Sequence, residues 1–235
     1  MSNYEKILTE LRFPVLPKAL TSSTAIIETF WPGRFKHWTV ENIYVAILHS
    51  DIDARKSREQ LRIEPKRFVY SLEGPGVRSE FNEKFFALLK KVESRLKPTK
   101  YSRVGVRSFS ALPAPGFSKI VASYRSEGKF LDPDLSNALS GCDLFKDFAL
   151  TLEGNSSRLV CGPMQLAQRH PNLSNFSSSQ DLPTEFFYAD IDCYRGDISR
   201  SKLRKEFERI LAQNDGIASR LSNYVIEGVE ADGQK

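Results

Sequence analysis

The clearest pattern in the chain is a helical stripe of apolar residues between residues 79 and 96. The apolar positions recur every three or four residues, at Phe81, Phe85, Leu88, Leu89, Val92 and Leu96. Ser79 is a favourable N-cap, and Pro98 ends the pattern because proline lacks an amide hydrogen. The stripe predicts an amphipathic helix over 79–96. A second stripe, with Gly216 as a potential kink, predicts a helix over 199–226.

Alternation of polar and apolar residues predicts most of the remaining structure as strands. The predicted strands cover 42–49, 60–72 with a break at Pro65, 101–113, 147–152, 158–164 and 185–194. The strand over 101–113 is the best of them. In its first part, Tyr101-Ser-Arg-Val-Gly-Val-Arg107, the side chains of Arg103 and Arg107 lie on one face because residues two apart in a strand point the same way.

The order of these elements predicts an α+β fold built from two similar halves, each an antiparallel sheet covered by a long amphipathic helix. The first half is 1–113, a connection follows over 114–146 with a short helix near 134–140, and the second half is 147–235. The opening residues are expected to pack as an edge segment.

Other segments are interpreted as irregular. Residues 168–183 are polar and rich in serine and asparagine, which predicts a mobile loop.

The charge and the cysteine content indicate the kind of partner and the cellular compartment to expect. The 34 basic residues exceed the 29 acidic ones, for a net charge of +5 and a pI near 9.0, which favours an anionic partner. Three scattered cysteines, Cys142, Cys161 and Cys193, fit a reducing cytoplasm. No apolar run is long enough for a membrane span, and no signal peptide is evident, so a cytoplasmic location is expected.

Two acidic fragments could bind a metal ion. Asp190 and Asp192, like Asp51 and Asp53, stand two apart in a predicted strand end and point the same way. Oxygen ligands of this kind suit a hard cation such as Mg²⁺. The alternative is a solvated strand end, which the lack of a third ligand at motif spacing favours. We find no catalytic motif, and no cofactor is predicted.

Basic residues surround the predicted first sheet. Arg55, Arg58, Arg67, Arg103 and Arg107 are candidate binding residues, together with the ring of Tyr101. Arginine beside exposed aromatic rings on a sheet is one way in which single strands of nucleic acid are bound. The alternative is a solvated basic face above an aromatic core.

Three fragments carry a resemblance to a sporadically distributed, uncharacterised family of bacterial proteins. They are Leu11-Arg-Phe-Pro14, the strand from Tyr101 to Arg107, and Asp190-Ile-Asp192 before a long last helix. Here Arg107 is followed by Ser-Phe-Ser, where the family tends to have tyrosine and asparagine. The resemblance implies an intracellular bacterial setting, and the patchy distribution of the family implies defence-related gene clusters. The family has no established activity that the resemblance could imply for this chain.

The sequence therefore predicts a non-catalytic binding or accessory protein whose partner is another protein, in a bacterial defence or toxin–antitoxin context. The alternative is a nucleic-acid-binding protein or a metal-dependent nuclease.

Overall fold

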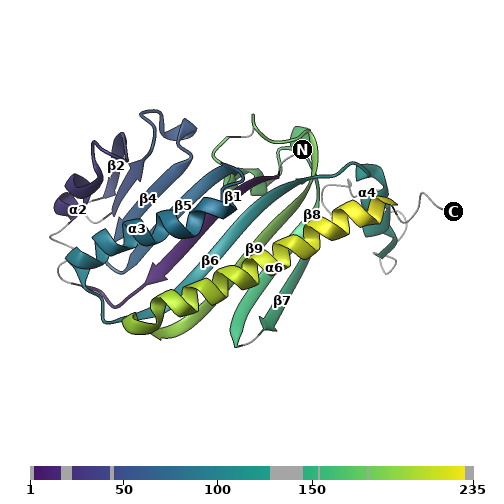
Figure 1. The fold of residues 1–235 in the computed structure, drawn as a ribbon. Coiled ribbons are helices and arrows are strands. Elements are labelled where there is room, and N and C mark those ends of the chain that lie inside the picture. The colour runs from purple at the N-terminus through teal and green to yellow at the C-terminus, as the bar shows by residue number, and fades with distance from the viewer. Residues whose placement is uncertain are drawn as a thin grey trace.

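The chain forms one continuous antiparallel sheet (Figure 1). A computed structural model describes residues 3–16, 23–42, 45–127, 145–152, 154–178 and 180–230. The nine strands of the sheet follow the order β2-β3-β4-β5-β1-β6-β9-β8-β7. Their bounds are β1 Tyr4–Arg12, β2 His37–Asn42, β3 Val45–His49, β4 Glu59–Glu64, β5 Arg67–Pro75, β6 Lys100–Pro113, β7 Lys146–Leu152, β8 Asn155–Gln165 and β9 Glu185–Ser199. The α-helices of the described residues are α2 Ser23–Phe30, α3 Arg78–Leu96, α4 Phe117–Glu127 and α6 Leu203–Glu230.

The prediction of two similar halves with separate sheets is wrong, because β6 of the first predicted half pairs with β9 of the second, and all nine strands form one sheet. One edge of β1 pairs with β5, and the other pairs with β6 from Tyr4↔Ala111 to Arg12↔Arg103. The far edge of β6 pairs with β9. Strands from both predicted halves therefore share one hydrogen-bonded ladder. The opening residues are likewise central in the sheet, not an edge segment.

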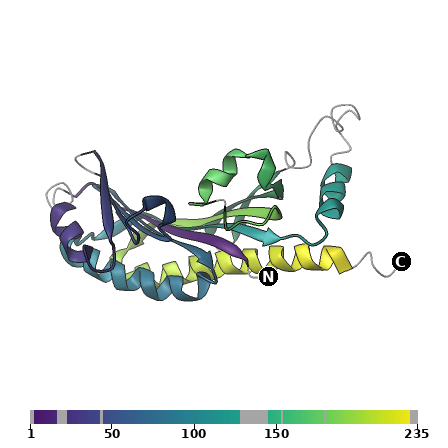
Figure 2. The same ribbon diagram turned by 90° about the horizontal axis from the view of Figure 1, so that it is seen from above.

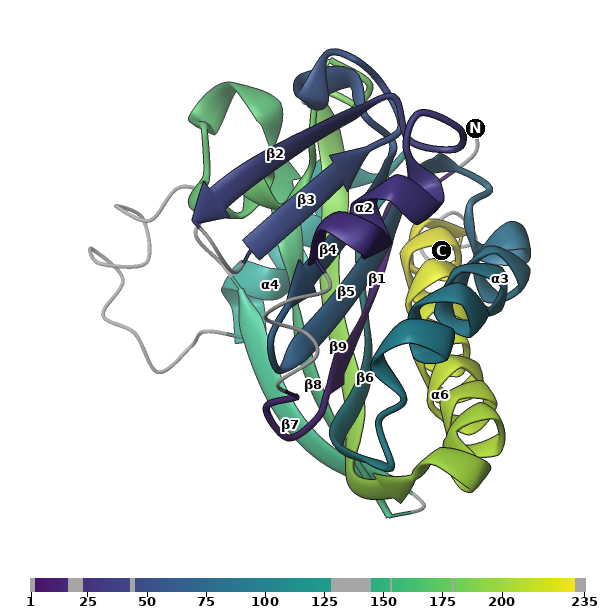
Figure 3. The ribbon, with the colours of Figure 1, turned by 90° about the vertical axis from the view of Figure 1, so that its left-hand side faces the viewer.

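The two long helices cover the same face of the sheet (Figures 1 and 3). The ring of Phe85 on α3 stacks on the ring of Phe207 on α6, with 4.4 Å between centroids. Both rings are fully buried in the main apolar cluster. This face is the helix face, and we name the opposite one the open face.

A shorter segment packs on part of the open face (Figure 2). The cover segment, residues 166–178 and 180–184, contains the 3-10 turns η3 (Leu166–Gln168) and η4 (Pro171–Asn175). Its Phe176 is buried against Tyr4, Phe109 and Tyr188. The segment predicted as a mobile loop is thus anchored through a second apolar cluster.

Several local predictions agree with the structure, and others do not. The helix predicted over 79–96 is α3, and the break at Pro65 separates β4 from β5. The last helix is one continuous element from Leu203 to Glu230, and Gly216 lies within it. The helix expected near 134–140 lies outside the described residues, as does Cys142.

Two features of the described residues concern membrane-spanning helices and the cysteines. No helix among them is long and apolar enough to cross a membrane. Cys161 and Cys193 are both free and buried.

Candidate functional site: the arginine face

The strand β6 places its arginines on the open face. Arg103 and Arg107 point away from the helices, whereas Val104 and Val106 between them are fully buried on the helix face. Tyr101 is also on the helix side, where it is 1% exposed and donates a hydrogen bond to Glu93. The structure therefore brings Arg103 and Arg107 together and separates Tyr101 from them.

Pairing across strands extends these two arginines into a row of alternating charges, which we name the arginine face. It consists of six arginines and six carboxylates: Arg12, Arg62, Arg67, Arg103, Arg107 and Arg158 with Glu10, Glu41, Glu64, Asp147, Asp190 and Asp192. The row reaches from β2 and β4 across the centre of the sheet to β8 and β7.

The centre of the row is tightly paired. Arg107 donates two hydrogen bonds to Asp190, at 2.8 and 2.7 Å, and Arg103 donates to Asp192 at 2.9 Å. Planar forks of this kind are among the stronger and more specific polar contacts in proteins. The hydrogen bond from Arg107 to Asp190 raises the pKa of Arg107, so that this guanidinium stays charged.

Three arginines lie directly opposite one another near the centre, and one carboxylate compensates them. Arg67, Arg12 and Arg103 are register partners across β5, β1 and β6. Like charges in direct register destabilise a sheet. Glu10 lies 2.5 Å from Arg12, 3.3 Å from Arg67 and 3.5 Å from Arg103, and so offsets the repulsion among all three.

In two pairs of the row, Arg107–Asp190 and Arg12–Glu10, the arginine is much more exposed than its carboxylate. The side chain of Arg107 is 42% exposed against 12% for Asp190, and that of Arg12 is 51% exposed against 16% for Glu10. Each guanidinium has five N–H donors, of which the carboxylate uses one or two. At these two pairs the surface therefore presents oriented donors above more deeply placed acceptors.

Gly105 allows the central stacking contact. The guanidinium carbon of Arg103 lies 3.8 Å from the ring centroid of Tyr194, which is the register partner of Gly105. A Cβ atom at position 105 would approach the Tyr194 Cβ to 3.3 Å and the Arg103 Nε to 3.5 Å. The Arg-x-Gly-x-Arg pattern of this strand thus leaves room for Arg103 to lie across the glycine.

The two aspartates considered for metal binding are engaged by arginines. Asp190 and Asp192 each accept hydrogen bonds from a guanidinium. Burial raises the pKa of Asp192, against the opposing effect of Arg103 and Arg107. The described residues contain no group of three or more histidine, cysteine or acidic side chains that could hold a metal ion.

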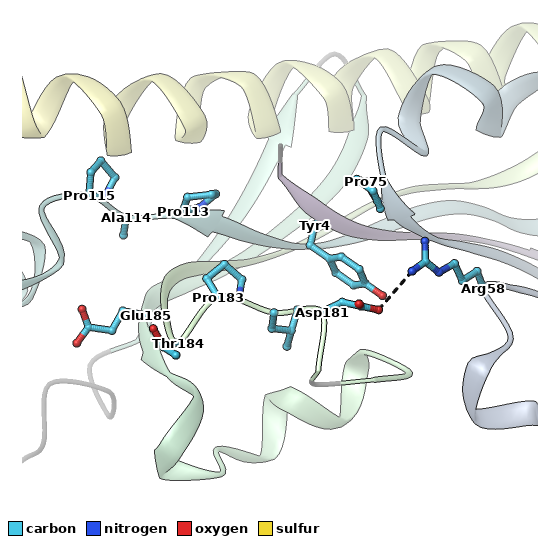
Figure 4. Close-up of a pocket in the computed structure, with 11 residues that line it drawn as sticks. Tyr4, Arg58, Pro75, Pro113, Ala114, Pro115, Asp181, Pro183, Thr184 and Glu185 are labelled. Atoms are coloured by element: carbon cyan, nitrogen blue, oxygen red, sulfur yellow. Dashed lines mark hydrogen bonds and ion pairs between the residues drawn. The ribbon is translucent and has the colours of Figure 1, made fainter. Parts of the chain in front are cut away.

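Arg58 lies apart from the arginine face, at an apolar groove of about 980 Å³. Figure 4 shows Arg58 beside Asp181, and their side chains form an ion pair at 3.4 Å. The groove runs between the end of the cover segment and the ends of β5 and β6, and four prolines line it: Pro75, Pro113, Pro115 and Pro183. The side chain of Arg55 lies outside the described residues.

A buried carboxylate fastens the cover segment to the sheet. Glu73 is 3% exposed and accepts hydrogen bonds from Tyr4, at 3.0 Å, and from the backbone and hydroxyl of Ser177, at 2.8 and 2.6 Å. The Lys6 ammonium lies 3.4 Å from the same carboxylate. Glu73 therefore joins three separate parts of the chain.

Replacing Glu73 by alanine is expected to release the cover segment, because Tyr4 and Ser177 lose their buried acceptor. Amide hydrogen exchange within residues 166–178 should become about tenfold faster, and the free energy of unfolding should fall by about 1–3 kcal/mol. The matched control is Glu185→Ala, because Glu185 is exposed at the start of β9, directly after the cover segment. This substitution should leave the exchange rate and the free energy of unfolding nearly unchanged. Unaltered exchange at Ser177 in Glu73→Ala would contradict this role.

Reasoning from the sequence identified Arg67, Arg103, Arg107, Asp190 and Asp192 but missed the partners on β1 and β8. Glu10 and Arg12 alternate with buried Ile7, Thr9 and Leu11. That period of two was the signal for a strand, yet nothing in it indicates which strands would lie beside it.

Comparison with known proteins leaves the chain without an assigned family. No family model matches it, and no curated protein matches it.

Proposed function

We propose that the chain is a non-catalytic binding protein that holds another protein on its arginine face. The observation that carries the proposal is the row of six arginines paired with six carboxylates, in which Arg12 and Arg107 are much more exposed than the carboxylates they pair with. Such a row offers many oriented donors, whereas its net charge is zero.

The balance of charge favours a protein partner over a nucleic acid at this face. Binding to a phosphate backbone depends on net positive charge, which displaces counterions from the nucleic acid. The arginine face has no net positive charge, because its six arginines are balanced by six carboxylates. Arginine is enriched at protein interfaces and at their energetic centres, and alternating charges fix the register of a partner.

Two further features support a binding role. The central carboxylates are neutralised by arginines and so are poorly suited to acid–base work. Burial raises the pKa of the Cys161 and Cys193 thiols, which keeps them protonated and weakly nucleophilic. If the resemblance to the sporadically distributed bacterial family holds, the partner belongs to a defence-related gene cluster.

The test removes one ion pair without changing the net charge. In Arg107→Gln/Asp190→Asn, both partners become neutral amides of similar shape, so no unpaired charge is left in the sheet. We expect a partner captured from the source lysate by the parent chain to bind at least about tenfold more weakly to this variant. Capture is performed with and without nuclease treatment of the lysate, and affinity is then measured with the purified partner.

The chain offers a closely matched control on the helix face. Arg195 and Glu206 form an ion pair at 2.8 Å with side chains 37% and 14% exposed, against 2.7 Å, 42% and 12% for Arg107 and Asp190. Arg195→Gln/Glu206→Gln should leave partner binding intact. Equal loss in both variants, or a captured species that nuclease removes, would reject the arginine face as a protein-binding site.

A further inference from the structure

The positive charge of the chain is concentrated in two short segments. Residues 90–100 and 200–205 contain nine basic residues and one acidic residue, a net charge of +8 in a chain whose total is +5. We name these nine residues the basic patch: Lys90, Lys91, Arg95, Lys97, Lys100, Arg200, Lys202, Arg204 and Lys205. The rest of the molecule is therefore slightly acidic.

The fold brings the two segments together on the helix side. The backbone amide of Arg200 donates to the carbonyl of Thr99 at 3.1 Å, and its side chain reaches Glu93 at 3.2 Å. The stacking of Phe85 on Phe207 holds α3 beside α6. Figures 1 and 3 show the two helices side by side on one face of the sheet. The basic patch thus surrounds the point where the end of α3 meets the beginning of α6.

Little negative charge balances this surface. All nine basic residues are exposed. The one carboxylate within the two segments, Glu93, is largely buried and is already bonded to Tyr101 and Arg200. Glu208 pairs with Arg204 at 3.0 Å, in an exposed geometry worth well under about 1 kcal/mol.

Four of the basic residues stand where they disfavour the helix. Arg200, Lys202, Arg204 and Lys205 precede or open the 28-residue helix α6, at the positive end of its dipole. Cations there are unfavourable, and an anion is favoured. This end of α6 therefore adds to the attraction of the patch for phosphate.

We propose that the basic patch binds the phosphate backbone of duplex nucleic acid without reading its sequence. A single strand is usually held by exposed rings on which its bases stack. The rings that patch cations contact are instead packed into the protein: Arg204 covers Phe86, and Lys91 covers buried Phe30. In the described part of the chain, the rings that these two cations cover are thus not free to stack on bases, which fits a duplex, whose bases are already stacked.

This site is independent of the arginine face. The patch lies on the helix side of the sheet and the arginine face on the other side, and they differ in net charge. A chain with both sites would connect a protein to nucleic acid. Failure of either proposal leaves the other standing, because the two tests use different ligands and different residues.

The experiment measures fluorescence anisotropy with mixed-sequence duplexes of DNA and of RNA, each about 20 base pairs long, over a range of salt concentrations. With six or more phosphates contacted, affinity should fall about a thousandfold between 50 and 200 mM salt. Lys90→Gln/Lys97→Gln/Lys202→Gln/Lys205→Gln should bind about 100-fold more weakly at 100 mM salt. Its salt slope should be reduced by about one for each lysine that contacts a phosphate.

The matched control neutralises four exposed lysines elsewhere, at positions 36, 56, 66 and 119. It has the same net charge as the patch variant and should bind within about threefold of the parent chain. Equal weakening in both variants would show that the net charge of the chain explains the loss of affinity. That result would overturn the proposal of a specific site at the basic patch. Tighter binding to a single strand of the same length would overturn the duplex assignment. Binding to vesicles with anionic lipid but not to either duplex would overturn the choice of nucleic acid.

Discussion

Replacing Phe207 by alanine is expected to lower the free energy of unfolding by about 3–5 kcal/mol, because it empties the centre of the core between both long helices. The Phe207 ring stacks on Phe85 and meets Phe86 edge-on, with 5.3 Å between centroids. Since α3 and α6 are held together there, the loss should exceed that of a peripheral core residue. Urea unfolding monitored by circular dichroism measures it.

An exposed aromatic on the same helix provides the control. Tyr224 is 47% exposed, so Tyr224→Ala should change the free energy of unfolding by less than about 0.5 kcal/mol. Equal effects at the two positions would mean that the junction of α3 and α6 is not a centre of stability.

Replacing Arg78 by alanine is expected to cost about 3–5 kcal/mol of stability, because it leaves the buried Glu5 carboxylate without its charged partner. The guanidinium of Arg78 donates to Glu5 at 3.1 Å, to Asn214 at 3.0 Å and to Asp215. It thereby ties the start of α3 to the start of β1 and to α6. Burial lowers the pKa of Arg78, but Glu5 and Asp215 more than offset this, and the pKa is raised overall.

A second substitution separates the unpaired charge from lost packing. Glu5→Gln in the Arg78→Ala background replaces a stranded carboxylate by a neutral amide, which should restore at least about 1 kcal/mol. Thermal unfolding at fixed pH compares the two variants. No recovery would show that the cost comes from the missing side-chain contacts alone. The exposed Arg204→Ala serves as the reference and should be nearly neutral.

The long helices were predictable because their signals are local. Phe81, Phe85 and Leu88 recur at the helical period, and Pro98 marks the end of the element within a few residues of sequence. The broad face assignment of β6 was equally local, because alternation alone separates Arg103 from Val104. These features need no knowledge of distant residues.

The joining of the strands was not predictable in the same way. An alternating segment such as β1 looks the same whether it lies at an edge or between two neighbours, and its partners begin at Arg67 and Lys100. The arginine face was hard to predict for the same reason, because Glu10 and Arg158 belong to it only through the register of β1 and β8 with the neighbouring strands. The prediction of a mobile loop for the cover segment failed for another reason. The segment is mostly polar in composition, but the buried ring of Phe176 anchors it to the sheet.

The central place of β1 has a consequence for the order in which the molecule is assembled. Of the described strands, β1 is the first to be synthesised, yet one edge waits for β5 and the other for β6, almost a hundred residues later. Until then that second edge is unpaired, and the apolar side of β1 still lacks α6, which follows later in the chain. Pairing between such distant segments slows folding and leaves strand edges open to misassembly. The nascent chain is therefore most vulnerable in the interval before β6 emerges, when the strand destined for the middle of the sheet still has a free edge.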